Sequence, residues 1–323
     1  MSLKNVFSGD KKPLLALVGP TGAGKTTVGI VLAKRLGTEI ISVDSRQVYR
    51  GFDIGTAKPV PEERKEVVHH LIDIASPWER FSAADFVRAA TPVIERLHSQ
   101  GKLPVLVGGT GLYFRALIDG IFPAPPADLN LRRQMLSEEA EKGAGWLFSQ
   151  LREKDPAAAA RIHPNDLVRI VRALEIYRTT GSPISKLQNW SSAPQNFRVL
   201  WAGIERPRKE LYTRAEQRID RMISAGFPGE VKKLMSQGFS KKSPAMLGLG
   251  YSRMVDFIDG KCTMEEAVRK FKQDTRHYIK RQMTWFKNDA RIEWIEVTSA
   301  EEPSETAEKI FGMVERELLC RTS

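Results

Sequence analysis

A glycine-rich run near the start of the chain combines the residue types of a phosphate-binding loop. It reads Gly19-Pro20-Thr21-Gly22-Ala23-Gly24-Lys25-Thr26, between the apolar residues 14–18 and a helical pattern that ends at Gly37. The backbone N–H groups of such a loop and the N-terminus of the following helix form a cradle for a diphosphate or polyphosphate. Lys25 would lie against the phosphates as a point charge, and the Thr26 hydroxyl would reach Mg²⁺. The run therefore predicts a bound phosphate chain with magnesium, without identifying the molecule that carries the phosphate.

A carboxylate follows the next apolar run. Asp44-Ser45 comes directly after residues 40–43, which are typical of a buried strand. Ligands of open α/β sheets bind at the carboxyl ends of the strands, so we expect Asp44 beside the phosphate loop. Three roles stay open for Asp44: a turn or cap residue, an indirect ligand of magnesium, and a catalytic base.

Glycines follow a third apolar run, residues 103–107, in the order Gly108-Gly109-Thr110-Gly111. In many nucleoside triphosphatases an Asp follows this strand and holds the magnesium ion. Its replacement by glycine argues against a motor ATPase or a switch GTPase. Glycine permits the close approach of a ligand or of another backbone, and Thr110 could hydrogen-bond to whatever lies there. A tight turn alone is the alternative interpretation.

Other polar residues carry weaker signals. His69 and His70 are adjacent, and on a strand they would point to opposite faces, so a structural role is favoured over a shared metal ion. Arg169 and Arg172 are neighbours on one predicted helix, off its apolar stripe, and their spacing alone favours a solvated face.

A helical pattern over residues 264–287 separates basic from apolar side chains. This arrangement suits docking on a phosphate backbone, and it suits any amphipathic surface helix equally well. The basic side contains Lys272, Arg276, Lys280 and Lys287, and the apolar side contains Phe271, Ile279, Met283 and Phe286.

These residues require a scaffold of alternating strands and helices in the first third of the chain. Near-continuous apolar strands that alternate with helices predict a parallel sheet covered on both faces, which is an α/β fold. We expect strands over 14–18, 39–43, 70–74 and 103–107, and helices over 26–36 and 83–100.

The pattern changes at a proline-rich hinge, residues 122–126, after which the chain is helical to about residue 190. One helix there is expected to begin after Asn165 or Asp166 and to end at Gly181. We therefore expect a helical insertion, 127–195, within a P-loop α/β core made of 1–126 and 196–323. The C-terminal part is predicted to hold strands over 198–204 and 291–297, and helices over 208–235 (interrupted near 226–229), 264–287 and 305–319.

Composition sets broader limits. The 323 residues are 41% hydrophobic and 28% charged, which is typical of a soluble globular protein. No apolar run is long enough to span a bilayer, the lysine-rich residues 1–13 lack a secretory signal, and a cytoplasmic location is expected. Cys262 and Cys320 predict neither a disulfide framework nor a zinc site. The net charge of +11 suits a polyanion such as nucleic acid, or simply a basic protein.

Seven motifs follow one another along the chain. They are the run Gly19–Thr26, Ile41-Ser42-Val43-Asp44-Ser45-Arg46-Gln47-Val48-Tyr49, Asp53-Ile54-Gly55-Thr56-Ala57-Lys58-Pro59, His69-His70-Leu71-Ile72-Asp73, Gly108-Gly109-Thr110-Gly111-Leu112-Tyr113, Arg161-Ile162-His163-Pro164-Asn165-Asp166 and Lys280-Arg281-Gln282-Met283-Thr284-Trp285-Phe286. Together, in this order, they resemble the tRNA dimethylallyltransferase family, also called tRNA isopentenyltransferases or IPP transferases, in its shorter bacterial form. The resemblance covers the chain from about residue 14 to residue 286.

The resemblance implies transfer of a dimethylallyl group from dimethylallyl diphosphate to N6 of adenosine 37 in the anticodon stem-loop of tRNA. The phosphate loop would hold the prenyl diphosphate rather than ATP, Mg²⁺ would be the cofactor, and the enzyme is expected to be a monomer. The implied catalytic residues are Asp44 as general base, with Thr21, Lys25 and Arg214 at the diphosphate and Thr26 at the metal. The implied tRNA contacts are Asp44, Ser45, Arg46, Gln47, Thr110, Val168, Arg169, Ile170, Val171 and Arg172.

Three other functions compete with this interpretation. A P-loop kinase of small molecules would transfer phosphate from ATP and would not need the basic C-terminal helix. An adenylate isopentenyltransferase would act on free AMP, ADP or ATP. An RNA-binding protein with a degenerate phosphate loop would catalyse nothing, but the intact Gly24-Lys25-Thr26 argues against it.

Overall fold

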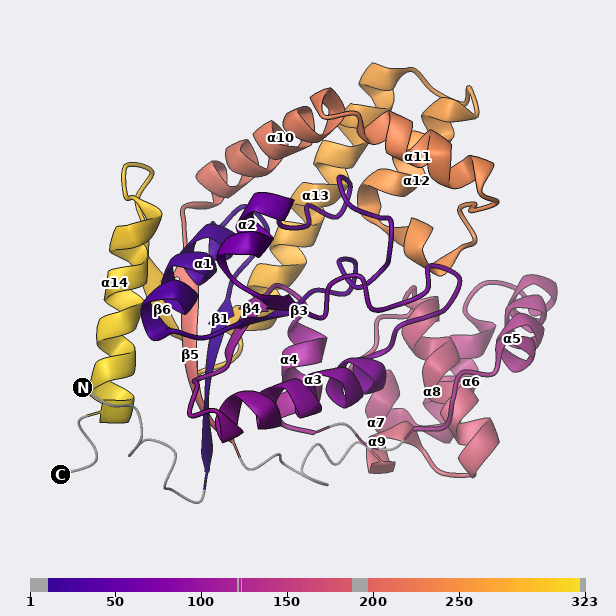
Figure 1. The fold of residues 1–323 in the computed structure, drawn as a ribbon. Helices are drawn as coiled ribbons and strands as arrows, with labels where there is room; N and C mark the ends of the chain where they lie inside the picture. The colour runs from indigo at the N-terminus through magenta and orange to yellow at the C-terminus, as the bar shows by residue number, and fades with distance from the viewer. Residues whose placement is uncertain (1–10, 121, 123, 188–196, 320–323) are drawn as a thin grey trace. The chain divides into compact units, whose positions relative to one another are not determined.

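The computed structural model describes residues 11–120, 122, 124–187 and 197–319 (Figure 1). The expected loop over 189–196 and Cys320 lie outside these residues. The chain divides into two compact units, which are described separately. The first comprises Met1–Ile118 and Asn196–Ser323, and the second comprises Asp119–Gln195. The helical insertion expected over 127–195 falls within the second unit.

A six-stranded parallel sheet forms the centre of the first unit, in the order β3-β2-β4-β1-β5-β6. The predicted α/β fold is confirmed. The chain runs outward from β1 to β2 and β3 and returns to place β4 beside β1, so the carboxyl ends of β1, β2 and β4 meet. The strands are β1 Lys12–Val18, β2 Ile40–Val43, β3 His69–His70, β4 Val105–Gly108, β5 Phe197–Glu205 and β6 Glu293–Glu296.

Strand β3 is shorter than the predicted 70–74. Leu71 and Asp73 have φ values of 63° and 59°, so the backbone enters the left-handed region and leaves the sheet after His70. The two histidines have the predicted structural role. Their ring nitrogens lie 2.8 Å from the Val67 carbonyl oxygen and 2.6 Å from a Glu39 carboxylate oxygen.

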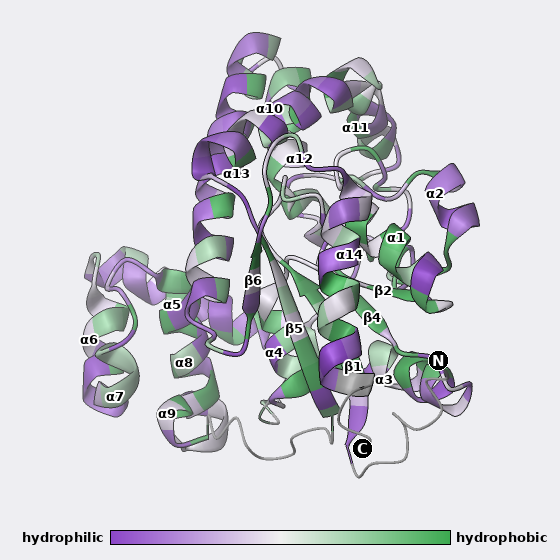
Figure 2. Cartoon of the chain, turned by 90° about the vertical axis from the view of Figure 1, so that its left-hand side faces the viewer, coloured by the Kyte–Doolittle hydropathy of each residue, from purple (hydrophilic) through white to green (hydrophobic). Residues whose placement is uncertain are grey.

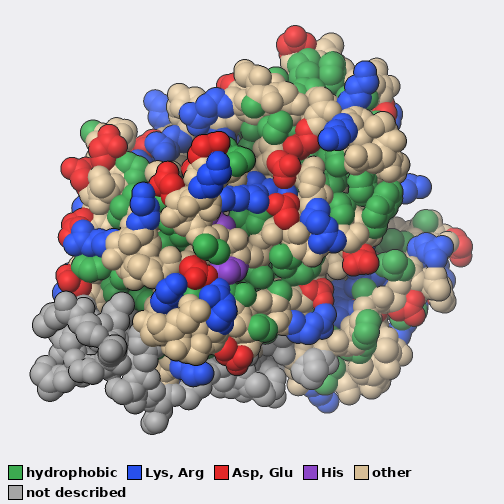
Figure 3. Space-filling view, viewed as in Figure 1, with side chains coloured by type: hydrophobic (Ala, Val, Ile, Leu, Met, Phe, Trp, Pro, Cys, Tyr) green, Lys and Arg blue, Asp and Glu red, His purple; other side chains and the backbone are tan. Residues whose placement is uncertain are grey.

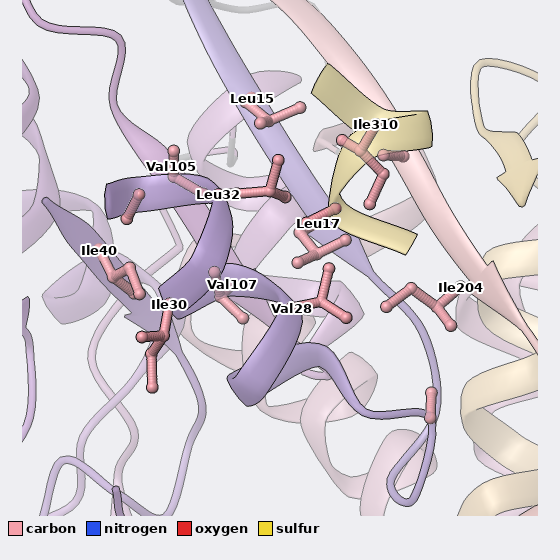
Figure 4. Packing of buried hydrophobic residues seen from close by; sticks show 14 of the residues in the cluster. Leu15, Leu17, Val28, Ile30, Leu32, Ile40, Val105, Val107, Ile204 and Ile310 are labelled. Carbon is pink, nitrogen blue, oxygen red and sulfur yellow. The ribbon is translucent and has the colours of Figure 1, made fainter. Parts of the chain in front are cut away.

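Helices cover both faces of the sheet. On one face lie α1, Lys25–Leu36, and α14, Pro303–Val314; on the other lie α3, Ala83–Ser99, and α4, Gly111–Ile118. The central strands β1, β2 and β4 are mainly hydrophobic, whereas the edge strand β6 has a glutamate at each end, and the helices carry a polar outer side (Figure 2). Figure 4 shows how side chains of α1 pack against those of the strands and of α14, through Val28, Ile30, Leu32, Leu15, Leu17, Val105, Val107 and Ile310.

A second hydrophobic cluster of the first unit lies among its C-terminal helices. These helices are α10 Arg208–Ser224, α11 Phe227–Ser236, α12 Leu249–Ile258 and α13 Met264–Lys287. The segment Val48–Phe52 after β2 packs into the same cluster. The break between α10 and α11 falls at the predicted glycine, because Gly226 has a φ of 93°. The sequence did not predict α12.

Shorter elements complete the first unit. Helix α2 spans Pro61–Glu66, and a 3₁₀ turn spans Pro244–Leu247. The single helix predicted over 305–319 is instead α14 followed by a π-helical turn, Glu315–Leu319. None of the described helices has both the length and the apolar character that crossing a membrane requires.

The described part of the second unit consists of five helices around their own core. Helix α8 begins after Asp166, whose carboxylate accepts the Arg169 N–H at 3.1 Å, and it ends at Gly181 with a φ of 71°, as predicted. The core includes Met135, Leu147, Ile170 and Leu174. The helices are α5 Leu129–Lys142, α6 Trp146–Lys154, α7 Pro156–Ala159, α8 Leu167–Thr180 and α9 Ile184–Leu187.

Candidate active site

The predicted phosphate loop connects the end of β1 to the first residue of α1, Lys25. Gly24 precedes the helix with a φ of 99°, a conformation that favours glycine. The Lys25 Nζ donates to the Pro20 carbonyl oxygen at 2.8 Å. From outside the loop, Arg206 Nε donates to the Ala23 carbonyl oxygen at 3.1 Å and Arg214 Nε donates to that of Gly22 at 2.9 Å. The loop is therefore held in shape by residues that follow β5.

A cavity of about 340 Å³ lies beside this loop, and all of its lining belongs to the first unit. One part of the lining is polar and comes from the phosphate loop and the ends of neighbouring elements: Thr21, Lys25, Thr26, Asp44, Arg218 and Gln282. Another part comes from the second hydrophobic cluster: Ile219, Met222, Leu249, Tyr251 and Phe271. The cavity can therefore hold a molecule that has both a polyanionic group and a hydrocarbon group.

The polar part of the cavity is cationic. Arg218 donates to the Thr21 hydroxyl, and its buried Nε has no hydrogen-bond partner among the described residues. Within the described part of the chain, neither Lys25 nor Arg218 forms an ion pair with a carboxylate. Burial, and then the charge of Arg218, lower the pKa of Lys25 to about 7, against the opposing effect of Asp44. Uncompensated cations in a cavity favour the binding of an anion.

Asp44 lines the same cavity, at the end of β2. Its Oδ1 accepts the N–H groups of Arg46 at 2.7 Å and Gln47 at 3.2 Å. Asp44 is thus a turn residue, one of the roles left open by the sequence. Because both bonds engage Oδ1, the carboxylate keeps Oδ2 for a ligand, and the structural role is compatible with that of a base.

The other residues after β2 are held in place by their own contacts. The Thr110 hydroxyl accepts the Ser45 N–H at 3.1 Å. The Gln47 side chain accepts from the Ser42 hydroxyl at 2.9 Å, and Arg46 Nη1 donates to the Pro244 carbonyl oxygen at 3.1 Å. Ser45, Arg46 and Gln47 line the cavity. Their contact with RNA, and that of Thr110, stays a prediction.

The glycines after β4 allow the close approach of other parts of the chain. A Cβ atom at Gly109 would lie 2.3 Å from the Gln282 amide nitrogen, and one at Gly111 would lie 2.1 Å from the Trp285 ring. Gln282 on α13 connects the two glycine loops: its Nε2 donates to the Gly109 carbonyl oxygen at 2.9 Å and its Oε1 accepts the Thr21 N–H at 2.9 Å. A Cβ atom at Gly108 would lie 2.1 Å from the Val43 carbonyl oxygen, so the close approach of another backbone is confirmed as one of the two interpretations of these glycines.

Sequence reasoning did not assign three residues that line the cavity. Arg218 follows Arg214 by one helical turn and donates to Thr21 of the loop from within the cavity lining, whereas the exposed Arg214 donates to the Gly22 carbonyl oxygen and is not part of that lining. Tyr278 and Gln282 continue a row with Phe271 and Thr275 on α13, and polar residues on a buried helical face were the available signal. Burial, followed by the charge of Asp44, raises the pKa of Tyr278 to about 12, so its phenol keeps the proton. Contact of Arg214 with a diphosphate stays a prediction.

The structure places the remaining predicted residues, 168–172, on α8 of the second unit. Val168 is 81% exposed, while Ile170 and Val171 are buried. Arg169 is exposed beside Asp166, at 3.4 Å. Arg172 is instead engaged by Glu175 and by the Pro125 carbonyl oxygen, the latter at 2.9 Å. Their contact with RNA stays a prediction.

The basic side of α13 is largely paired with acidic groups. Lys272 contacts Asp220, Arg276 contacts Glu216 and Lys287 contacts Glu205. These ion pairs connect α13 to α10 and to the end of β5, so this row is not a free phosphate-binding stripe. Figure 3 shows Lys and Arg interspersed with Asp and Glu on one face of the molecule. Among the described residues, no group of three or more His, Cys, Asp or Glu is placed to hold a metal ion.

Comparison with known proteins gives a consistent result. The sequence model described as IPP transferase matches residues 47–289. The chain is 45% identical to the tRNA dimethylallyltransferase of Symbiobacterium thermophilum, over 96% of this chain and 98% of that protein. It is 44% identical to the tRNA dimethylallyltransferase of Geobacter sulfurreducens, over 94% of this chain and 99% of that protein.

Solved structures show the same similarity. The full-length tRNA isopentenylpyrophosphate transferase of Bacillus halodurans matches with a TM-score of 0.69 and 41% identity, over 98% of this chain and all of that chain (100%). A eukaryotic dimethylallyltransferase, in a study of its action on tRNA, matches with a TM-score of 0.80 and 26% identity, over 97% of this chain and 81% of that chain.

Proposed function

The chain belongs to the IPP transferase family, and on that premise we propose how its cavity transfers a dimethylallyl group to tRNA. The donor is dimethylallyl diphosphate, the acceptor is N6 of adenosine 37 in the anticodon stem-loop, and the products are N6-isopentenyladenosine and diphosphate. One observation supports assigning this reaction to the cavity. Lys25 and Arg218 at the phosphate loop, Asp44 and an apolar wall all line the same 340 Å³ space.

The nucleophile requires a base. The lone pair of adenine N6 is delocalised into the ring, so N6 is a weak nucleophile until its proton is removed. As the bond from N6 to the allylic carbon forms, Asp44 accepts that proton at Oδ2 while Oδ1 stays bonded to the N–H groups of Arg46 and Gln47. The N–H bonds fix the orientation of the carboxylate. The adenosine must leave its stack to reach this position, and in a single-stranded loop this unstacking requires little free energy.

The leaving group requires positive charge. As the bond between the allylic carbon and the diphosphate oxygen breaks, negative charge accumulates on the diphosphate. Lys25, Arg218 and the N–H groups at the start of α1 stabilise that charge, and Arg214 supports the loop through its hydrogen bond to the Gly22 carbonyl oxygen. Because the pKa of Lys25 is about 7 in the empty cavity, its amine is partly neutral at neutral pH. Binding of the diphosphate would favour the protonated, positively charged form.

The donor set fits magnesium bound mainly through the substrate. Thr26 lines the cavity and offers a hydroxyl oxygen, and Mg²⁺ characteristically takes few protein ligands beside phosphate oxygens and waters. When bound, the ion would neutralise part of the diphosphate charge. Thr26 would hold it, with the remaining ligands supplied by the diphosphate and water.

The hydrocarbon part of the donor fits the apolar lining. Ile219, Met222 and Phe271 would contact the dimethylallyl group and keep water from the allylic carbon as positive charge develops there. Exclusion of water favours transfer to N6 over hydrolysis of the donor.

The experiment incubates the full chain with dimethylallyl diphosphate, Mg²⁺ and an anticodon stem-loop RNA, and analyses the digested nucleosides by mass spectrometry. The expected product is isopentenylated adenosine at the position that follows the anticodon. Prenylation of free AMP at the same rate as RNA would favour an adenylate isopentenyltransferase. Consumption of ATP without prenyl transfer would favour a kinase.

A further inference from the structure

The segment Asp53–Pro59 has no role in the proposed chemistry, yet it forms part of the cavity wall. Gly55, Thr56 and Ala57 line the cavity. Gly55 lies so close to the second hydrophobic cluster that a Cβ atom there would be 2.2 Å from the Phe227 ring. The position of this wall is therefore set by contacts with the C-terminal helices.

One carboxylate accepts hydrogen bonds from the backbone of this segment. Glu230, on α11, accepts the N–H groups of Asp53 at 3.0 Å, Ile54 at 2.7 Å and Gly55 at 3.3 Å. The Tyr251 hydroxyl donates to the same carboxylate at 2.7 Å. Burial and the charge of Glu230 raise the pKa of Tyr251, so this phenol remains a donor. Four donors on one half-buried carboxylate constitute a strong, charge-assisted anchor.

The other end of the segment is fixed as well. The ammonium group of Lys58 is buried and donates to the Tyr49 carbonyl oxygen and to Asp53 Oδ1, both at 2.7 Å, and also to Asp73. Between the two anchors, Ala57 has a φ of 52°, which is uncommon for a residue other than glycine. Such a conformation persists only where the surrounding contacts determine it.

This segment connects to Asp44 through one side chain. Gln47 Nε2 donates to the carbonyl oxygens of Thr56 at 3.4 Å and Ala57 at 3.0 Å. The backbone N–H of Gln47 donates in turn to Asp44 Oδ1 at 3.2 Å. Hydrogen bonds, joined by the short stretches of backbone between them, thus connect Glu230 to residues 53–57, these residues to Gln47, and Gln47 to Asp44.

We propose that Glu230 is a positioning residue, which orients the Asp44 carboxylate and the adjoining cavity wall through the backbone of residues 53–57. This inference rests on the proposed function, since it concerns the group that receives the proton of the acceptor. The phosphate loop has separate supports in Arg206, Arg214 and Gln282. Loss of the Glu230 carboxylate should therefore impair proton transfer and leave the binding of the prenyl diphosphate intact.

The test compares Glu230→Gln with the unaltered chain. The amide keeps the size of the side chain, but its NH₂ group cannot accept a backbone N–H. We expect kcat for RNA prenylation to fall by about 10-fold to 100-fold, a range typical of a misplaced catalytic group. The KM for dimethylallyl diphosphate should change by less than about twofold, because the diphosphate supports are untouched. A purely structural effect would instead reduce the active fraction, which titration of binding sites with dimethylallyl diphosphate measures.

Two further variants make the comparison specific. Asp256→Asn removes a carboxylate of α12 that pairs with Lys241 and does not contact the segment, so its kcat should match the unaltered chain. Gln47→Met breaks the connection at a second point. If Glu230 acts through Gln47, the double variant Glu230→Gln/Gln47→Met should have a kcat only slightly below that of the less active single variant.

Each outcome of these measurements either supports or contradicts the role of Glu230. Equal kcat for Glu230→Gln and the unaltered chain, or fully multiplicative losses in the double variant, would overturn it. If Glu230→Gln does not fold, Tyr251→Phe removes one donor from the carboxylate, and an unchanged kcat there also counts against the inference. Failure of the unaltered chain to prenylate RNA in the same assay would instead contradict the proposed function.

Discussion

The cavity of the first unit and the buried cluster around Glu175 in the second unit use ionised side chains in opposite ways. In the first unit, Lys25 and Arg218 line a cavity without forming an ion pair with a carboxylate in the described part of the chain. In the second unit, the carboxylate of Glu175 is only 1% exposed and pairs with two arginines, Arg132 at 2.7 Å and Arg172. It also accepts the Asp128 N–H at 2.7 Å.

This contrast separates charges that fold the protein from charges that bind a ligand. Around Glu175, two cations and a backbone N–H compensate the anion, and the arrangement connects α5 to α8. Around the cavity, burial and the charge of Arg218 disfavour the charged form of Lys25, so the empty cavity lowers the stability of the fold. We therefore expect substitutions at the cavity to lower activity with little loss of stability, and substitutions around Glu175 to do the reverse.

The largest expected effect belongs to the carboxylate of the cavity. Asp44→Asn keeps an oxygen that accepts the N–H groups of Arg46 and Gln47, and removes the base. The single-turnover rate of prenyl transfer should fall by about 10³-fold, within the range for a lost general base. Binding of the stem-loop RNA, measured by filter retention, should remain within about twofold. Full activity in this variant would exclude Asp44 as the base.

The second prediction concerns the buried carboxylate of Glu175, which supports the fold of the second unit. Glu175→Gln leaves two partly buried arginines without a charged partner, which should lower the stability of the second unit by about 3 kcal/mol. Hydrogen exchange of the α5 and α8 amides would locate the loss. Glu138→Gln, which removes a more exposed partner of Arg178, is the matched control and should cost less than about 1 kcal/mol. Equal losses would show that burial of the pair contributes nothing.

The third prediction tests whether the cavity cations are uncompensated. With a pKa of about 7, Lys25 is mostly neutral at pH 8 in the empty cavity. A bound diphosphate raises that pKa, so binding takes up protons and the affinity falls as pH rises above 7, by at most about tenfold per pH unit. Calorimetry of dimethylallyl diphosphate binding in buffers of different ionisation enthalpy measures the uptake. Arg218→Met should reduce it, because Arg218 lowers the pKa of Lys25. The absence of uptake at pH 8 would contradict the low pKa.

The smallest expected effect distinguishes two arginines on one helix. Arg169 is exposed, so Arg169→Ala should weaken RNA binding by about threefold and lower the salt dependence by about one phosphate contact. Arg172→Ala should mainly reduce stability, because Arg172 supports Glu175. Binding isotherms at several salt concentrations and thermal unfolding check both. An unchanged salt slope for Arg169→Ala would remove it from the RNA contacts.

Sequence reasoning succeeded where the signal was local. The phosphate loop, the position of Asp44 and the ends of α8 follow from strand, loop and cap patterns that lie within a few residues of each other. The parallel sheet followed from apolar runs alternating with helical periods. These features depend on backbone rules that hold in any tertiary context.

Long-range contacts account for what the sequence did not predict. The pairing of Thr21 with Gln282 joins residues 261 positions apart, and no short pattern encodes it. The basic side of α13 was correctly identified, but its acidic partners lie on α10 and β5. Arg172 and Glu175 have a helical spacing that indicates a pair, and only the additional contact with Arg132 gives that pair its buried, structural character.

The same contact between Thr21 and Gln282 sets the order in which the enzyme can become active during synthesis. The phosphate loop is synthesised before the second unit, whereas Arg206, Arg218 and Gln282 are synthesised only after it. A nascent chain that ends before α13 has the loop and Asp44 but lacks the bridge between Thr21 and Gly109. The cavity is therefore complete only after α13 has been synthesised, and a product truncated before α13 would lack a finished site.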